Sequence, residues 1–365
     1  MTSIAAIKFD NFNKSLPAKN RYTFDIHNID LGLVNSVRRI ILTNIPVVGF
    51  DGEIDPSLEV IKNDGPLHNE FMLHRFGLIP IHFSEDETDN FVSDDHHFEL
   101  NVQNTSGNTI NVTTHDFQVS KNGKDIGKKE LQRLFPVDSI TKQPILITRL
   151  RPGETLHVKG KAILSTAHHH AGFSPVSLCT LSFKQDTASA AHKQAQNVLE
   201  KERIYFQNKY GDPTIVQFEI ETESALSPKY LVSKAIDIIM QKLFRIIEEI
   251  YIDDSEYIQF QREKSHTGTN TQFVFKDEDD TLGNVLQSMM HNHYIRDKKP
   301  ATKDHRMTYV GYYCPHPLES RMVLRFNFED PEAPDIDYIN TLKEHCERTL
   351  AYLQNIQAEW SREAP

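Results

Sequence analysis

The chain has 365 residues, 38% of them hydrophobic and 25% charged, and its 40 Lys and Arg against 51 Asp and Glu give a formal net charge of −11. This length predicts two or three domains, and the composition is that of an ordinary globular protein. The acidic balance excludes a broad phosphate-binding surface, although it leaves room for a local basic patch.

Three features of the composition bear on the compartment. The three cysteines, Cys179, Cys314 and Cys346, are too far apart for a disulfide framework or a paired zinc site, which favours a reducing compartment. No apolar run approaches the roughly 18 residues of a membrane span, and the first residues lack the features of a secretory signal. We therefore expect a soluble intracellular protein.

Alternating apolar and polar residues predict four strands, over 21–27, 216–221, 272–276 and 321–328. Two long amphipathic helices follow. The first begins at Pro228 after the N-cap residue Ser227, and the last begins near Asp335. Each carries one apolar stripe: Val232, Ala235, Ile239, Leu243, Ile246 and Ile250 in the first, and Ile339, Leu342, Cys346, Leu350 and Leu353 in the last.

An internal repeat relates the two ends of the chain. Phe24 precedes the sequence Asp30-Leu31-Gly32, and Phe275 precedes Thr281-Leu282-Gly283 at a constant offset of 251 residues. In each copy a strand ends, an Asp30 or Thr281 N-cap follows, and an amphipathic helix begins. The repeat predicts two similar sheet-and-helix units whose long helices pack on each other as an intramolecular pseudo-dimer.

The repeat also predicts the domain organisation. The first unit comprises 1–50 and 214–252, interrupted by an inserted, mainly β domain at 51–213, because so long an interruption must fold by itself. The polar segment 253–271 is predicted to be a linker to the second unit at 272–365. The fold class is therefore α+β. Within the insert we expect an acidic loop at 85–95 and a closing helical run near 188–207.

Catalytic and metal sites have weak candidates. The side chains of His168-His169-His170 diverge, so they would need ligands from elsewhere, such as 94–97, to form a zinc site. The acidic run 277–280 precedes a helix and is explained by capping. Nucleotide-binding and hydrolase motifs are absent from the sequence. We expect no catalytic residue, cofactor or metal, and a metal-dependent hydrolase using the histidines is the alternative.

Two basic features remain. Arg38-Arg39 lies on the first helix, where one arginine faces away from the apolar stripe and could pair with an acidic group. The run 296–306 carries a net charge of +3 and is predicted to be a mobile loop. A free-standing nucleic-acid-binding module that uses this run is the second alternative.

Several motifs resemble those of the alpha-like subunits of DNA-directed RNA polymerase. The helix Asn35-Ser36-Val37-Arg38-Arg39, the fifteen-residue run from Leu67 to Ile81, and His170 to Val176 are similar to the third subunit of RNA polymerase II and its archaeal counterpart. Asp280 to Asn284 and Gly311 to Glu319 are similar to the eleventh subunit. The two look fused here, as in the polymerases of large cytoplasmic DNA viruses of the African swine fever virus type.

The resemblance implies a non-catalytic platform that holds the largest and second-largest polymerase subunits for transcription, with a small zinc-bearing tenth-subunit-like protein beside it. DNA and RNA would be reached only through the complex, and no membrane is involved. It implies the host cytoplasm and virion for a viral protein and the nucleus for a cellular one. Relatives hold a metal on a cysteine cluster in the insert, where this chain has only Cys179. The implied subunit-interface residues are Asn35, Arg38, Arg39, Glu70, His74, Arg75, Gly77, Ser174, Pro175, Leu282, Gly283, Asn284, His316 and Pro317.

Overall fold

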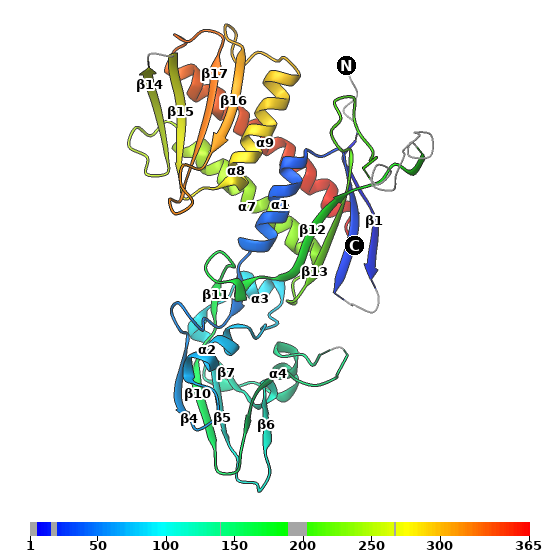
Figure 1. The fold of residues 1–365 in the computed structure, drawn as a ribbon, viewed down its shortest axis with the longest axis vertical. Coiled ribbons are helices and arrows are strands. Elements are labelled where there is room, and N and C mark those ends of the chain that lie inside the picture. The colour runs from blue at the N-terminus through cyan, green and yellow to red at the C-terminus, as the bar shows by residue number, and fades with distance from the viewer. Residues whose placement is uncertain (1–5, 16–19, 139, 189–202, 266–267) are drawn as a thin grey trace. The chain divides into compact units, whose positions relative to one another are not determined.

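The computed structural model describes the chain except for residues 1–5, 16–19, 139, 189–202 and 266–267 (Figure 1). It divides into two compact units. Unit 1 comprises Met1–Ile40, Cys179–Ile220 and Val232–Pro365, and unit 2 comprises Ile41–Leu178 and Glu221–Leu231. Within the described part of the chain, none of the helices combines the length and hydrophobicity needed to cross a membrane.

The first sheet of unit 1 has the order β1-β2-β13-β12. Its strands are β1 (Lys8–Ser15), β2 (Arg21–His27), β12 (Val176–Phe183) and β13 (Ile215–Thr222). The helices α1 (Leu31–Thr43) and α7 (Pro228–Glu249) accompany it. The predicted strands at 21–27 and 216–221 and the helix from Pro228 are confirmed. The prediction missed β1, and it placed β12 in the inserted domain.

The second sheet of unit 1 has the order β14-β15-β17-β16. Its strands are β14 (Ile258–Ser265), β15 (Gly268–Lys276), β16 (Met307–Tyr313) and β17 (Arg321–Phe328). It is accompanied by α8 (Asp280–Met290), the π-helix η4 (His291–Arg296) and α9 (Asp335–Glu363).

The linker prediction for 253–271 is therefore wrong over most of its length, because β14 and the start of β15 form an antiparallel hairpin there. β14 is an edge strand, and an edge strand needs fewer apolar side chains than a central one. The polar composition of β14 is also typical of a linker, which explains the wrong prediction. The N-cap prediction also shifts, since Asp279, and not Thr281, caps α8 by accepting a hydrogen bond from the Thr281 backbone N–H.

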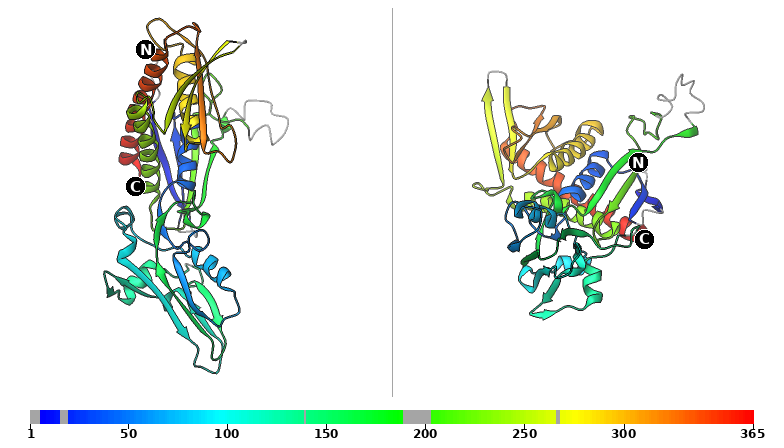
Figure 2. Two further views of the ribbon diagram at one scale, coloured as in Figure 1. Left: turned by 90° about the vertical axis from the view of Figure 1, so that its left-hand side faces the viewer. Right: turned by 60° about the horizontal axis from the view of Figure 1, so that its bottom comes forward.

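The two long helices, α7 and α9, run side by side (Figure 2). The Gln357 side chain on α9 donates to Asp237 on α7 at 2.6 Å. The apolar stripe of α7 is buried throughout, and in α9 only Ile339 of the predicted stripe remains half-exposed. Two sheet-and-helix units with packed long helices confirm the α+β class and the predicted intramolecular pseudo-dimer. We call the parts of unit 1 before and after residue 253 its N-terminal and C-terminal halves.

Unit 2 is mainly β. A five-stranded sheet has the order β4-β10-β5-β7-β8, and two short pairs, β3 with β11 and β6 with β9, lie beside it. The strands are β3 (Val47–Gly49), β4 (Leu58–Asn63), β5 (His96–Gln103), β6 (Ile110–Thr113), β7 (Gln118–Lys121), β8 (Lys124–Asp125), β9 (Leu146–Leu150), β10 (Thr155–Lys161) and β11 (Ile163–Ser165). The helices are α2 (Asn69–Gly77), α3 (Glu85–Asp89) and α4 (Lys128–Leu134), with short 3-10 turns η1 (Ser93–Asp95), η2 (Thr114–Asp116) and η3 (Ala171–Phe173).

Two predictions for the insert need correction. The acidic segment 85–95 contains α3 and η1, because Ser84 and Glu87 form a capping box that starts a helix. The compact insert ends at Leu178, and not at residue 213. Of the helical run predicted near 188–207, residues 189–202 lie outside the described part, and residues 205 and 207 pair in extended bridges.

A buried histidine on α9 makes the protein sensitive to acid. His345 is 1% exposed, and burial lowers its pKa to about 3, so the folded protein resists its protonation. The unfolded chain binds this proton below about pH 6.5. Stability is therefore complete above pH 6.5 and falls as the pH decreases, by about 2 kcal/mol between pH 6.5 and 5 at about 1.4 kcal/mol per unit. Urea unfolding of the wild type and His345→Met should show a shallower pH dependence in the variant; equal slopes would contradict this role.

Candidate subunit interfaces

Helices α1 and α8 carry the repeated motif, and each contacts the N-terminus of the other. Ser36 on α1 is 1% exposed and donates through Oγ to the Thr281 carbonyl oxygen at 2.9 Å. In the other direction, Ser288 on α8 donates to the carboxylate of Asp30 at 2.8 Å. The contact therefore has approximate twofold symmetry, because a serine of each half donates a hydrogen bond to the helix N-terminus of the other half.

The predicted interface arginines mainly make contacts inside the chain. Arg39 donates to the Thr281 hydroxyl at 2.9 Å and to the Asp279 carboxylate at 3.0 Å. This is the acidic partner that the sequence left unnamed, and it belongs to the C-terminal half. Arg38 donates to the side-chain oxygen of Asn35 at 3.0 Å.

The repeat motif on α8 is partly internal. Leu282 is 1% exposed, and Gly283 faces the ring of Tyr312, where an added Cβ would lie 2.4 Å from the nearest ring carbon. Gly283 is therefore required for the approach of α8 to β16. These two residues are buried within the chain, and their contact with another subunit stays a prediction. Asn284 is half-exposed beside them.

A buried ion pair also joins the halves. Glu278, just before α8, is 6% exposed and lies 2.6 Å from the ammonium group of Lys242 on α7. The Tyr257 hydroxyl donates to the same carboxylate at 3.0 Å. Burial raises the pKa of Glu278, and the attraction of Lys242 opposes the rise without cancelling it. Helix capping therefore accounts for the presence of Asp279 in the acidic run 277–280, whereas Glu278 forms the ion pair with Lys242.

In unit 2, the fifteen-residue motif forms α2 and the turn after it. Arg75 donates to the carbonyl oxygens of Leu146 and Ile147 on β9 at 2.9 Å each, which fixes α2 to that strand. Gly77 is buried, and an added Cβ there would lie 3.3 Å from the Gly52 backbone nitrogen. Arg75 and Gly77 therefore hold the motif in place within the unit.

The other face of α2 is open. Glu70 and His74 are exposed, and Phe71 and Leu78 expose 62% and 55% of their surface. Ile54, two residues after the Gly52 that Gly77 approaches, is also 59% exposed. Phe71 on α2 and Leu78 directly after it thus leave two large apolar side chains exposed, as is typical of a protein-binding surface. We define the α2 surface as Glu70, Phe71, His74 and Leu78.

The histidine run 168–170 contacts acidic residues of unit 2, and His74 of α2 contacts one of the same residues. His169 lies 2.8 Å from the Asp51 carboxylate, His170 lies 3.3 Å from Glu53, and His74 lies 3.4 Å from Glu53. Burial would raise the pKa of Asp51, but hydrogen bonds from His169 and three backbone N–H groups outweigh it and lower the pKa to about 2. The second predicted ligand set is engaged elsewhere, since Asp94 pairs with Lys161 at 2.6 Å.

The remaining predicted residues lie in turns. Ser174 donates to the Val176 carbonyl oxygen at 2.8 Å, and the Pro175 carbonyl oxygen accepts from the Glu223 N–H at 3.0 Å, so both organise the passage between η3 and β12. His316 and Pro317 are exposed in the turn between β16 and β17, next to Leu318, which is 90% exposed. This turn is therefore available to another chain.

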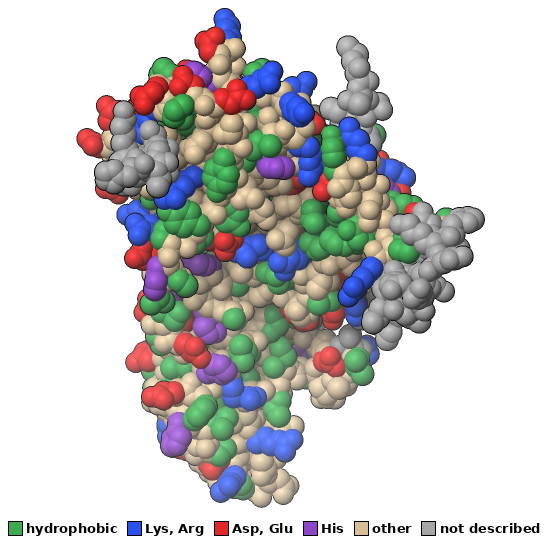
Figure 3. All heavy atoms as spheres, turned by 45° about the horizontal axis from the view of Figure 1, so that its top comes forward, with side chains coloured by type: hydrophobic (Ala, Val, Ile, Leu, Met, Phe, Trp, Pro, Cys, Tyr) green, Lys and Arg blue, Asp and Glu red, His purple; other side chains and the backbone are tan. Residues whose placement is uncertain are grey.

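The basic run 296–306 is anchored at its start. Arg296 pairs with Asp212 at 2.5 Å and lies 4.8 Å above the ring of Tyr210. On the face drawn in Figure 3, Lys and Arg side chains are interspersed with Asp and Glu. The charge on this face is therefore mixed.

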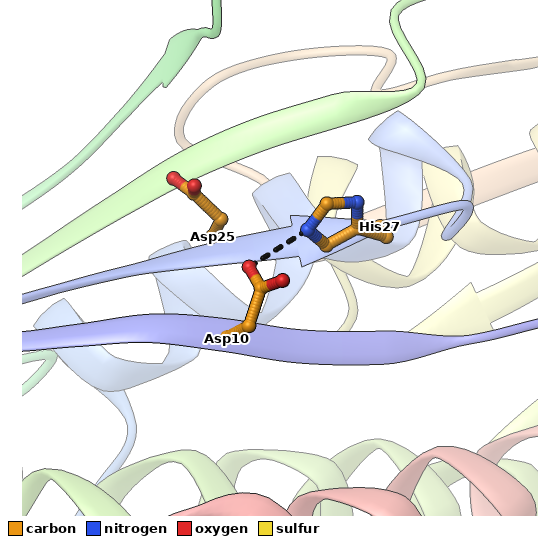
Figure 4. A group of neighbouring side chains, drawn as sticks. All are labelled: Asp10, Asp25 and His27. Carbon is orange, nitrogen blue, oxygen red and sulfur yellow. Dashed lines mark hydrogen bonds and ion pairs between the residues drawn. The ribbon is translucent and has the colours of Figure 1, made fainter.

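The sequence did not predict the one group of side chains that has the spacing of a metal site in the described part of the chain. Among the described residues, Asp10, Asp25 and His27 form the one set of three possible ligands that lie within 4.8 Å of one another. In Figure 4, Asp10 and His27 face each other, while the carboxylate of Asp25 is turned away from both. Lys8 pairs with Asp10 at 2.5 Å, and Lys184 pairs with the buried Asp25. A cation would have to displace both lysines, so the arrangement fits an ion-pair network better than a metal site.

Comparison with known proteins identifies the helix-and-sheet units. The family described as the RNA polymerase Rpb3/Rpb11 dimerisation domain matches residues 23–243, and a second description of the same domain matches residues 270–359. The first match alone covers more than half of the chain. The chain belongs to the Rpb3/Rpb11 family.

Individual relatives of this Rpb3/Rpb11 chain are distant. It is 24% identical over 266 residues to the RNA polymerase II subunit RPB3 of Schizosaccharomyces pombe, covering 64% of this chain and 84% of that one. It is 23% identical over 271 residues to the RNA polymerase subunit Rpo3 of Methanosphaera stadtmanae, covering 65% and 96%. It is 27% identical over 179 residues to the RNA polymerases I and III subunit RPAC1 of Saccharomyces cerevisiae, covering 42% and 51%. For this and two other curated relatives, the chain spans about half to three fifths of their length.

Proposed function

We propose that the chain is a non-catalytic assembly platform of a multisubunit DNA-directed RNA polymerase. The observation that carries the proposal is the pair of reciprocal hydrogen bonds between α1 and α8. These bonds join, inside one chain, the two regions that match the dimerisation-domain family. A fused pair needs no second alpha-like subunit, so its exposed surfaces are free for other polymerase chains. The fusion also supports the version found in large cytoplasmic DNA viruses, with the viral factory and virion as its location.

The partners we propose are the largest and second-largest subunits and a small zinc-bearing tenth-subunit-like protein. The α2 surface and the turn with His316, Pro317 and Leu318 are the places where we expect them to bind, because exposed apolar groups gather there. An affinity-tagged full chain, expressed in its source organism and purified at moderate salt, should retain two very large chains in equal amounts. Recovery of the chain alone would contradict the proposal.

A double substitution on the α2 surface tests where partners bind. Phe71→Ala with Leu78→Ala should leave the free energy of unfolding within about 0.5 kcal/mol, because both side chains are mostly exposed. It should lower the amount of co-purified large chain at least about tenfold if these side chains anchor a partner, since anchors at an interface cost about 2 kcal/mol or more each. The matched control is Val137→Ala with Ile140→Ala, which alters exposed apolar side chains elsewhere in unit 2. Equal recovery from both pairs would exclude the α2 surface.

The metal-dependent hydrolase has less support. The imidazoles of His169 and His170 lie against Asp51 and Glu53, and the neighbouring His168 backbone N–H donates to the Thr43 carbonyl oxygen. Among the described residues, the one set with metal-site spacing excludes them.

A further inference from the structure

A cleft of about 790 Å³, lined mostly by residues with polar side chains, lies within unit 1, where its two halves meet. The turn between β2 and α1 forms one wall, α8 and η4 form another, and residues 208–214 with Leu181 of β12 complete it. Its most frequent lining side chains are amides: Asn28, Asn35, Asn208, Asn284, Gln287 and Asn292. Its volume is in the range of protein ligand sites.

The charged groups Asp30, Asp212 and Arg296 of the cleft already have hydrogen-bond or ion-pair partners. The Asp30 carboxylate accepts from Ser288 and, at 2.8 Å, from the side-chain nitrogen of Asn292. Asp212 pairs with Arg296, whose guanidinium also lies over the ring of Tyr210. A phosphate or a carboxylate would therefore find no free cation on Arg296, and a metal ion would have to displace Ser288 and Asn292 from Asp30.

Several amide groups in the cleft retain hydrogen-bonding capacity. In the described structure, the side chain of Asn284 makes no hydrogen bond, and Gln287 uses only its oxygen, which accepts from the Tyr312 N–H at 3.3 Å. Asn292 uses only its nitrogen, on Asp30, and Asn35 uses only its oxygen, on Arg38. The open positions thus include both donors and acceptors, and they are uncharged.

Gly32 sets the depth of this cleft. An added Cβ at Gly32 would lie 3.1 Å from the Ser288 Cβ and 3.2 Å from the side-chain oxygen of Asn284. The absence of a side chain therefore lets α1 approach α8 and places the unpaired amide of Asn284 between them. Three of the amides, Asn35, Asn284 and Gln287, thus stand on the helices α1 and α8, where less backbone entropy is lost on binding than in a loop.

We propose that this cleft binds an extended main-chain segment of another polymerase subunit. A peptide group carries one donor and one acceptor and no charge, and a side-chain amide complements both at once. An anionic ligand would find Arg296 already paired with Asp212, and a cation would have to break the hydrogen bonds of Asp30, so a neutral polar ligand with repeated donors and acceptors fits best. The inference rests on the proposed function, because it needs a partner chain.

The test places a photo-reactive group at the rim of the cleft. His291 is exposed and lines the cleft, so His291→p-azidophenylalanine leaves every amide in place. In the tagged, assembled complex, illumination should link this position to one short run of consecutive residues in a single partner chain. The same amino acid at Asn355, which is exposed on α9 and does not line the cleft, should not reach that run.

A second variant measures the contribution of the amides. Asn284→Ala with Gln287→Ala should reduce the yield of the cross-link about tenfold, because it removes hydrogen bonds whose loss together costs about that factor. Asn355→Ala should not change the yield. Slower amide hydrogen exchange at residues 28–35 and 284–292 in the complex than in the free chain gives an independent readout that needs no variant.

The outcomes of these experiments distinguish a failure of this inference from a failure of the proposed function. Large chains that co-purify without a cross-link from the cleft and without slower exchange overturn this inference alone. Cross-links to a small molecule, or only to this chain itself, also overturn it. Failure of the unmodified chain to retain any large partner overturns the proposed function, and this inference with it.

Discussion

Replacing Trp360 with alanine is expected to lower the free energy of unfolding by about 3–5 kcal/mol, the usual cost of truncating a buried tryptophan. Trp360 is near the end of α9, in the C-terminal half, and is 1% exposed. Its ring centroid lies 5.0 Å from that of Phe9 on β1 and 4.9 Å from that of Phe24 on β2. The last turns of α9 therefore complete the core under the sheet of the N-terminal half.

Urea denaturation followed by circular dichroism measures this loss. Trp360→Phe is the matched control, because it keeps an aromatic ring in the same core and should lose clearly less stability. The side chain of Glu363, which accepts from the Phe9 backbone N–H at 2.8 Å, should lose this contact as the helix end loosens. A loss below about 1 kcal/mol would show that α9 does not depend on the first sheet.

Replacing Lys242 with alanine is expected to cost about 3 kcal/mol. The substitution leaves the carboxylate of Glu278 buried without its cation, and breaking a buried pair in this way costs about 3–5 kcal/mol. The side chain of Lys242 is 24% exposed, so we expect the lower end of that range. Loss of the lysine also removes the group that opposes the raised pKa of Glu278, and the pKa should rise further.

The pH dependence of the Lys242 variant gives an independent readout. A carboxyl group with a raised pKa in the folded protein favours folding most at low pH, where it is neutral, and the penalty grows as the pH increases through that pKa. Lys242→Ala should therefore lose less stability at pH 5 than at pH 8. Lys242→Met combined with Glu278→Gln should recover most of the loss. Equal losses at both pH values, without recovery in the double variant, would show that the pair is not buried as an ion pair.

The elements that sequence reasoning found are those whose pattern is local. The stripe of α7 from Val232 to Ile250 repeats at helical spacing because one face is buried along its whole length. In β17, every second residue from Met322 to Phe328 is buried for the corresponding reason, although Val323 on the other face is buried as well. The Leu-Gly repeat in α1 and α8 was visible in the sequence although its glycines face different neighbours, Ser288 for Gly32 and Tyr312 for Gly283.

The elements that sequence reasoning missed depend on neighbours that are distant in sequence. β14 is stabilised by pairing with β15 and has few apolar residues of its own, so its composition resembled a linker. The capping box of Ser84 and Glu87 was a local signal for α3 that the acidic composition concealed. Asp10 lies opposite Asp25 only because β1 pairs with β2 in that register. Arg39 and Asp279 are 240 residues apart, so their pairing required the pseudo-dimer first.

The most direct test of the pseudo-dimer is to cut the chain between its halves. Asp253 and Asp254 are exposed between α7 and β14, so a protease recognition sequence inserted between them should be cleaved in the folded protein. The account predicts that both fragments elute together from size-exclusion chromatography, at the position of the uncut chain and in equal amounts, until denaturant is added. Separation of the fragments under native conditions would contradict the intramolecular pseudo-dimer.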